Sequence, residues 1–176
     1  MIVSTGLKRI AENRLDEAEE KLPFLNPSLE THFIGKLQSR KIKRIVDLFD
    51  VIQSLENLEQ ARAISDCKKE IDVYLQVNLS GQKQRSGCDP SEVPFLIQEI
   101  KKLPYLNLIG VMGMASQSSQ LIREEFRTLK ALQGDLRECS MGMSSDFSIA
   151  IAEGATILRL GTYLFEHGLP DGVQIE

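Results

Sequence analysis

The alternation of short apolar runs with longer amphipathic stretches is the feature that most restricts how this chain can fold. The short runs have the length and residue types of β-strands, and the longer stretches carry apolar residues at helical spacing. Strict alternation with short connections predicts a parallel β-sheet with helices packed outside it. The expected strands span residues 8–13, 31–35, 50–54, 71–79, 106–114, 138–141 and 156–160.

About seven expected strands favour one α/β architecture. No dinucleotide-binding glycine fingerprint follows the first strand, so a (β/α)8 barrel of the TIM type is preferred over an open doubly wound sheet. The chain has 176 residues, whereas such barrels usually need roughly 200–250. We therefore expect one domain, residues 1–176, that forms an incomplete barrel without its first βα unit.

The composition argues against several classes of protein. A net charge of −4 leaves no excess of Lys and Arg to neutralise phosphates, so a nucleic-acid partner is not expected. No apolar run reaches the ~20 residues of a membrane span, and no signal peptide is visible. The cysteines Cys67, Cys88 and Cys139 lack metal-ligand spacing and indicate reduced thiols. We expect a cytoplasmic protein that binds neither membranes nor metals.

Residues 139–165 contain two glycine turns, each after an expected strand. In the first, Gly142 allows a tight turn, and Ser144 and Ser145 are expected to cap the next helix. In the second, Gly161 and Thr162 close the last strand. Glycine lets an anion approach the backbone closely, and a helix start presents free N–H groups. Together the two turns predict a phosphate cradle to which Ser144 and Thr162 add hydroxyls, although either turn alone is common in proteins without an anion site.

Arg159 lies within the apolar run of residues 156–160. An arginine keeps its charge, so an inward-facing Arg159 needs a polar partner. The alternative is a surface arginine on an edge strand. Because Arg159 lies between the two glycine turns in the sequence, we favour the first alternative, an arginine that faces the anion site.

Polar residues at other expected strand ends are candidates for the barrel mouth. Asn13 and Asn78 can hydrogen-bond a ligand, or serve only as cap and loop residues. His32 lies within a strand, where a lone histidine is more often a satisfied packing residue than a base. No Ser–His–acid order, pair of carboxylates with an evident role, or metal cluster stands out.

Five segments resemble a known family, the pyridoxal 5′-phosphate homeostasis proteins, which are related in fold to the N-terminal barrel of alanine racemase. The resemblance covers residues 6–166, and its C-terminal motif is very specific. The segments are GLKRIAENRLDEA, similar to GxxxFGENYVQE; THFIGKLQSRKIK, similar to HFIGxLQxNK; VNLSGQKQRSG, similar to VNxxGExxKxG; LIGVMGM, similar to LxGLMxx; and SMGMSSDFSIAIAEGATILRLGTYLF, similar to SMGMSxDxxxAIxxGxTxVRIGxxxFG.

The resemblance implies a monomeric barrel that holds pyridoxal 5′-phosphate and has no established turnover. By position, Arg159 would face the pyridine nitrogen of the cofactor. The remaining cofactor-binding residues implied by the resemblance are Ser144, Gly161 and Thr162 at the phosphate, Met143 beside it, and Asn13 and His32 on the ring side.

One departure from the family concerns the lysine that forms its Schiff base. In the family this lysine lies on the first strand, upstream of GxxxFGEN, but residues 1–5 of this chain contain no lysine. The family's phenylalanine and glycine are replaced by Ile10 and Ala11. Lys8 would sit at the wrong end of its strand, and Lys36 is the remaining nearby candidate. We therefore expect non-covalent or weak binding of the cofactor.

Two alternatives stay open. The first is a racemase-like or other barrel enzyme that acts on a phosphorylated small molecule. The second is a paralogue that no longer binds the cofactor. An incomplete barrel would also expose a strand edge, through which a dimer could form.

Overall fold

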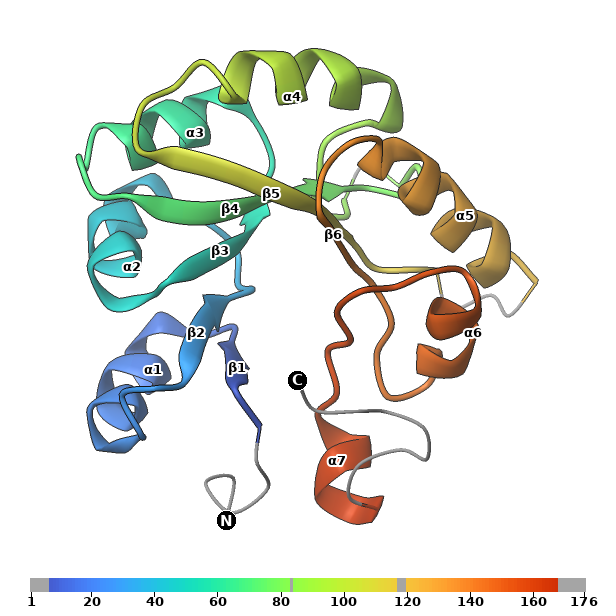
Figure 1. Ribbon diagram of the computed structural model, residues 1–176, viewed down its shortest axis with the longest axis horizontal. Coiled ribbons are helices and arrows are strands. Elements are labelled where there is room, and N and C mark those ends of the chain that lie inside the picture. The colour runs from blue at the N-terminus through green and yellow to red at the C-terminus, as the bar shows by residue number, and fades with distance from the viewer. Residues whose placement is uncertain (1–6, 83, 117–119, 168–176) are drawn as a thin grey trace.

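The computed structural model describes residues 7–82, 84–116 and 120–167. Within them, six parallel strands form one sheet in which each strand pairs with its neighbours in the sequence. The sheet curls around a common axis (Figure 1), which confirms the incomplete TIM-type barrel. The strands are β1 (Arg9–Glu12), β2 (Glu30–Phe33), β3 (Val51–Leu55), β4 (Ile71–Val77), β5 (Leu106–Gly113) and β6 (Glu138–Ser140).

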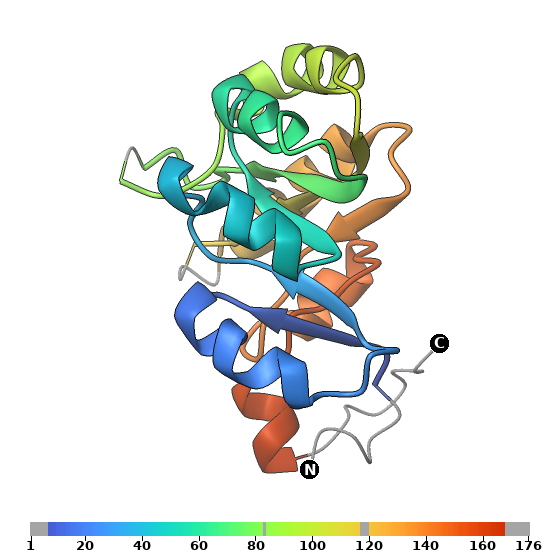
Figure 2. The same ribbon diagram turned by 90° about the vertical axis from the view of Figure 1, so that its left-hand side faces the viewer.

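Helices cover the outer side of the curled sheet, and Figure 2 shows the first three stacked along it. Short 3-10 segments precede or follow some of them: η2 (Leu22–Phe24), η3 (Ser39–Lys41) and η4 (Pro90–Glu92). The α-helices are α1 (Leu15–Lys21), α2 (Ile42–Leu48), α3 (Leu58–Ser65), α4 (Val93–Ile100), α5 (Ile122–Gln133), α6 (Phe147–Ala152) and α7 (Thr162–His167). None of the helices in these ranges is long and apolar enough to cross a membrane.

Strand β4 shows why the sequence pattern gave a parallel sheet. Its odd-numbered residues, such as Val73 and Leu75, belong to the main apolar core between the sheet and the helices. Tyr74 belongs to a second cluster, with Val51, Ile109 and Met112. Because both faces of the strand are covered, its residues form an almost continuous buried run, as parallel sheets do.

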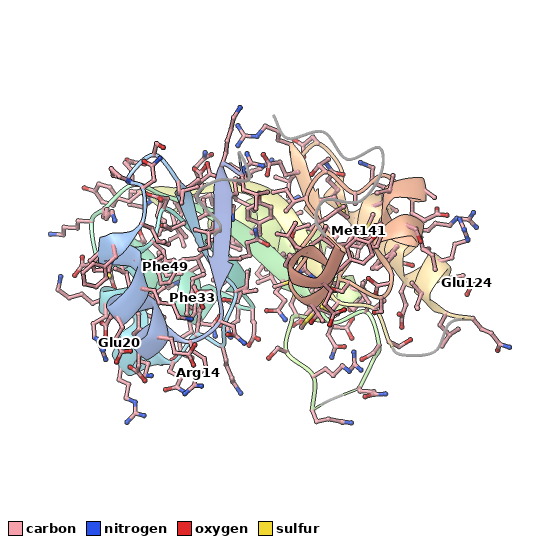
Figure 3. The ribbon with its side chains drawn as sticks, turned by 90° about the horizontal axis from the view of Figure 1, so that it is seen from below. Arg14, Glu20, Phe33, Phe49, Glu124 and Met141 are labelled. Carbon is pink, nitrogen blue, oxygen red and sulfur yellow. The ribbon has the colours of Figure 1, made fainter. Side chains whose placement is uncertain are left out.

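Helices form in the expected amphipathic stretches, and side-chain caps mark the start of two helical segments. Asn57 accepts a hydrogen bond from Gln60 N at 2.9 Å and starts α3. Asp89 forms a capping box with Glu92 at the start of η4, which leads into α4. Phe33 and Phe49 pack with ring centroids 5.2 Å apart, on the side of the sheet that α1 covers (Figure 3). Cys139, a free thiol, is fully buried.

The seventh expected strand, residues 156–160, is only an isolated parallel bridge between Ser140 and Ile157. Its backbone still follows β6: Met141 N donates to Ile157 O at 3.1 Å, and Arg159 N donates to Gly142 O at 2.9 Å. Strand β6 is three residues long and is followed by a turn at Gly142. Residues 156–160 therefore have too short a neighbouring strand to form a regular ladder of hydrogen bonds. Helix α7, which follows, was not predicted from the sequence.

The sheet is open at β1. Among the described residues, β1 pairs with β2 alone. An unpaired edge of this kind leaves backbone N–H and C=O groups free to pair with another strand. Association through this edge remains a prediction.

Candidate functional site

The two glycine turns predicted from the sequence meet in the structure. The Ser144 hydroxyl accepts a hydrogen bond from Tyr163 N at 3.1 Å, which joins the turn after β6 to the first turn of α7. The expectation that Ser144 and Ser145 cap the helix that follows them was wrong. Helix α6 begins after Asp146 without a side-chain cap bond, and Ser144 caps α7 instead.

We refer to Met143, Ser144, Gly161 and Thr162 as the candidate cradle. Gly161 and Thr162 are exposed, while Met143 and Ser144 are half-buried. A Cβ atom added to Gly161 would have no atom within 4 Å. The backbone at Gly161 is therefore open to approach by a small ligand, next to Thr162 in the chain and near Ser144, which contacts Tyr163 N.

Asp146 shapes the first turn of the cradle and was not singled out from the sequence. Its side chain is 4% exposed, and its Oδ1 atom accepts a hydrogen bond from Met143 N at 2.5 Å. Asp146 N in turn donates to Met143 O at 3.1 Å. The aspartate within the SMGMSSD motif was the available signal, because a buried carboxylate needs such backbone donors.

Arg159 is half-buried and faces inward, as one of the two alternatives predicted. Its Nη1 atom donates to Ser140 Oγ at 2.7 Å, and its Nη2 atom donates to Gly113 O at 2.8 Å. Burial lowers the pKa of Arg159 to about 10, while Asp146 opposes this shift. The guanidinium is therefore charged at neutral pH, yet it makes no ion pair with a carboxylate in the described part of the chain.

His32 is 3% exposed, and both of its ring nitrogens have a partner. Its Nδ1 atom lies 2.7 Å from Gln53 Nε2, and its Nε2 atom lies 2.7 Å from Glu30 Oε1. Burial lowers the pKa of His32 below 6.5, outweighing the opposite effect of Glu30. The other groups that face it are Gln53 on β3 and, more distantly, Arg9 on β1, Tyr74 on β4 and Glu138 on β6.

The lowered pKa of His32 predicts a pH-dependent contribution to stability. Because the unfolded chain binds a proton more readily at this residue, stability is lost as the pH falls through 6.5 towards the folded pKa. In His32→Asn this loss is absent. The difference in free energy of unfolding between the native chain and His32→Asn should shrink between about pH 7.5 and about pH 5.5. Urea denaturation at a series of pH values measures it, and a constant difference would contradict burial of a neutral imidazole.

The two asparagines at the strand ends differ in what they contact. Asn13 is exposed after β1, and its carbonyl packs so closely on Gly35 that a Cβ atom there would lie 2.0 Å away. Asn78 is engaged within its own loop, since its Nδ2 atom donates to Gln82 O at 2.8 Å. Asn78 is thus a loop residue, whereas the side chain of Asn13 remains exposed at the mouth.

A cavity of about 290 Å³ lies at the ends of β4 and β5, lined by Gln76, Val77, Asn78, Arg85, Ser86 and Met114. Lys8 and Lys36 are both exposed, but only Lys36 follows a strand, β2, at its mouth end, whereas Lys8 precedes β1 at the opposite end. The expectation about the family's lysine concerns residues 1–5, which lie outside the described residues.

Comparison with known proteins shows the class of barrel first. The sequence profile of the family described as "Alanine racemase, N-terminal domain" matches residues 2–167. A solved alanine racemase from Clostridium difficile has the same fold, with a TM-score of 0.75 at 16% identity over 95% of this chain and 47% of that chain. Fold and profile together identify a barrel of the alanine racemase N-terminal type.

Closer relatives narrow the family. A pyridoxal phosphate homeostasis protein from Pseudomonas aeruginosa is 37% identical over 95% of this chain and 79% of its own length. The structure of PipY from Synechococcus elongatus with PLP bound has a TM-score of 0.79 at 30% identity, covering 88% of this chain and 80% of that one. The chain belongs to the pyridoxal phosphate homeostasis protein family.

Proposed function

We propose that this chain binds pyridoxal 5′-phosphate at the barrel mouth and serves in homeostasis of this cofactor rather than in turnover of a substrate. The observation that carries the proposal is the junction of the two turns through Ser144 Oγ and Tyr163 N. It brings Ser144 close to the segment of Gly161 and Thr162, where the backbone of Gly161 is open. The P. aeruginosa relative, named for this role, and the PLP-bound PipY structure support the choice of ligand.

The residues present fit a phosphorylated pyridine. Ser144, Gly161 and Thr162, with Met143 beside them, would hold the phosphate. Arg159 brings a positive charge that no described carboxylate neutralises by an ion pair, which favours a dianionic ligand. On this proposal Arg159 faces the ring nitrogen, Asn13 lies on the ring side, and His32 supports that side from within the barrel.

Arg159 supports the part of the proposal that favours binding over turnover. Pyridoxal phosphate supplies an electron sink when its ring nitrogen is protonated. A permanently charged guanidinium disfavours a proton on a facing nitrogen, so Arg159 would keep the ring a weak sink. A site of this kind suits storage and transfer of the cofactor better than carbanion chemistry.

Calorimetric titration of the purified chain with pyridoxal 5′-phosphate, pyridoxal and inorganic phosphate tests the proposal. Because charge-assisted hydrogen bonds to the phosphate contribute about 1.5–3 kcal/mol each, pyridoxal should bind at least about tenfold more weakly than its phosphate ester. Equal affinity for the two would contradict a phosphate cradle.

Borohydride treatment and an assay of amino-acid racemisation distinguish the remaining alternatives. We expect no stable reduced adduct and no racemisation. An adduct at Lys36 would contradict non-covalent binding, and racemisation would favour an enzyme. Failure of the native chain to bind any of the three ligands would favour a paralogue without the cofactor.

A further inference from the structure

A continuous chain of hydrogen bonds crosses the barrel interior from Arg159 to Glu30. Arg159 Nη1 contacts Ser140 Oγ, Ser140 Oγ contacts Gln53 Oε1, and Gln53 Nε2 contacts His32 Nδ1, each at 2.7 Å. His32 Nε2 then contacts Glu30 Oε1, also at 2.7 Å. The same Oε1 atom of Glu30 is also paired with Arg9 Nε at 2.7 Å.

The contact between Gln53 and Ser140 spans the interior. Gln53 lies on β3 and Ser140 on β6, with β4 and β5 between them in the sheet. A flat sheet would hold these strands far apart, because neighbouring strands are about 4.8 Å apart. The hydrogen bond therefore depends on the curl of the barrel.

One assignment of protons satisfies every contact in the chain. A guanidinium can only donate, so Ser140 Oγ accepts from Arg159 and gives its own proton to Gln53 Oε1. The amide of Gln53 then donates to His32 Nδ1, and the proton of the imidazole lies on Nε2, facing Glu30. Each contact thus has a fixed donor and a fixed acceptor. A change at His32 or Gln53 therefore alters how the Ser140 hydroxyl is oriented as the acceptor for Arg159.

The polar interior is not required for packing. The same interior holds an apolar cluster of Val51, Tyr74, Ile109 and Met112, which shows that apolar side chains fit there. His32, Gln53 and Ser140 are 3%, 1% and 0% exposed. Buried polar groups cost stability unless all are paired, so their placement along one path to Arg159 indicates a role beyond folding.

We infer that Glu30, His32, Gln53 and Ser140 are positioning residues that fix the guanidinium of Arg159 towards the ring of the bound ligand. The inference rests on the proposed function. His32 acts through Gln53 and Ser140, because both of its ring nitrogens are already engaged. We call these four residues the relay. The relay orients the ring side of the site and leaves the candidate cradle, which holds the phosphate, unaffected.

The test compares two ligands in two relay variants, Ser140→Ala and Gln53→Met. Affinity for pyridoxal 5′-phosphate should fall about tenfold, the effect of one misplaced hydrogen bond to a charged group. Affinity for inorganic phosphate, which occupies the cradle alone, should stay the same. Ser140→Thr, which keeps the hydroxyl, should restore the lost affinity.

Ser54→Ala is the matched control, because the Ser54 hydroxyl is buried on the same strand as Gln53 and has no hydrogen-bond partner among the residues that the structure describes. It should change neither affinity. If the relay variants bind pyridoxal 5′-phosphate like the native chain, or lose both ligands equally, the positioning role is wrong. Failure of the proposed function would look different, since the native chain itself would then bind no pyridoxal 5′-phosphate.

Discussion

Replacing Arg159 with methionine is expected to weaken binding of pyridoxal 5′-phosphate about 100-fold, the loss of about 2–3 kcal/mol from one charge-assisted contact. The guanidinium is charged at neutral pH and is held by neutral groups, Ser140 Oγ and Gly113 O. Its charge is thus available to a ligand. Arg159→Lys keeps a charge but not the planar fork, so it should lose roughly tenfold. Calorimetric titration measures both.

Arg44→Met is the control for the loss of a positive charge. Arg44 lies on the outer face of α2 and pairs with Glu19 Oε1 at 2.9 Å through its Nε atom. An exposed pair of this kind contributes little, so ligand affinity should be unchanged. If Arg159→Met binds as tightly as Arg44→Met while both remain folded, Arg159 does not contact the ligand.

The candidate cradle could be predicted from the sequence because its parts lie close along the chain. Ser144 and Thr162 are separated by a single helix and one extended segment, so the local order of glycines, hydroxyls and apolar residues brings them near each other. Arg159 lies in the same segment. The cap of Ser144 on α7 could not be foreseen, because α7 itself was not predicted.

The interior relay could not be predicted from the sequence. Gln53 and Ser140 are 87 positions apart, and their contact depends on how far the sheet curls. Sequence periodicity indicates which face a residue occupies but not which residue it meets across a barrel. The prediction of a seventh strand was wrong for a related reason. Residues 156–160 have strand-forming side chains, but β6 is too short to provide a ladder beyond the bridge at Ser140.

The turn after β6 depends on glycine at position 142 more than on any side chain. Gly142 has φ of 92°, a conformation that costs other residues about 1–2 kcal/mol. A Cβ atom there would lie 2.5 Å from Ala150 Cβ and 3.0 Å from Leu158 Cδ2. Both neighbours are fixed, Ala150 in the buried core and Leu158 packed against it, so overpacking adds about 1–3 kcal/mol.

Gly142→Ala should therefore lower the free energy of unfolding by about 2–5 kcal/mol. The Gly142 carbonyl also accepts the N–H of Arg159 at 2.9 Å, so folded variant protein should bind pyridoxal 5′-phosphate more weakly. Gly154→Ala is the matched control: its φ of 87° imposes similar strain, but its nearest neighbour is the flexible end of Lys130 at 3.0 Å. It should cost about 1–2 kcal/mol and leave affinity unchanged. Urea denaturation measures the loss of stability in both variants, and titration measures their affinity for pyridoxal 5′-phosphate. If both variants lose the same free energy of unfolding, backbone strain, and not packing against α6, explains the requirement for glycine at position 142.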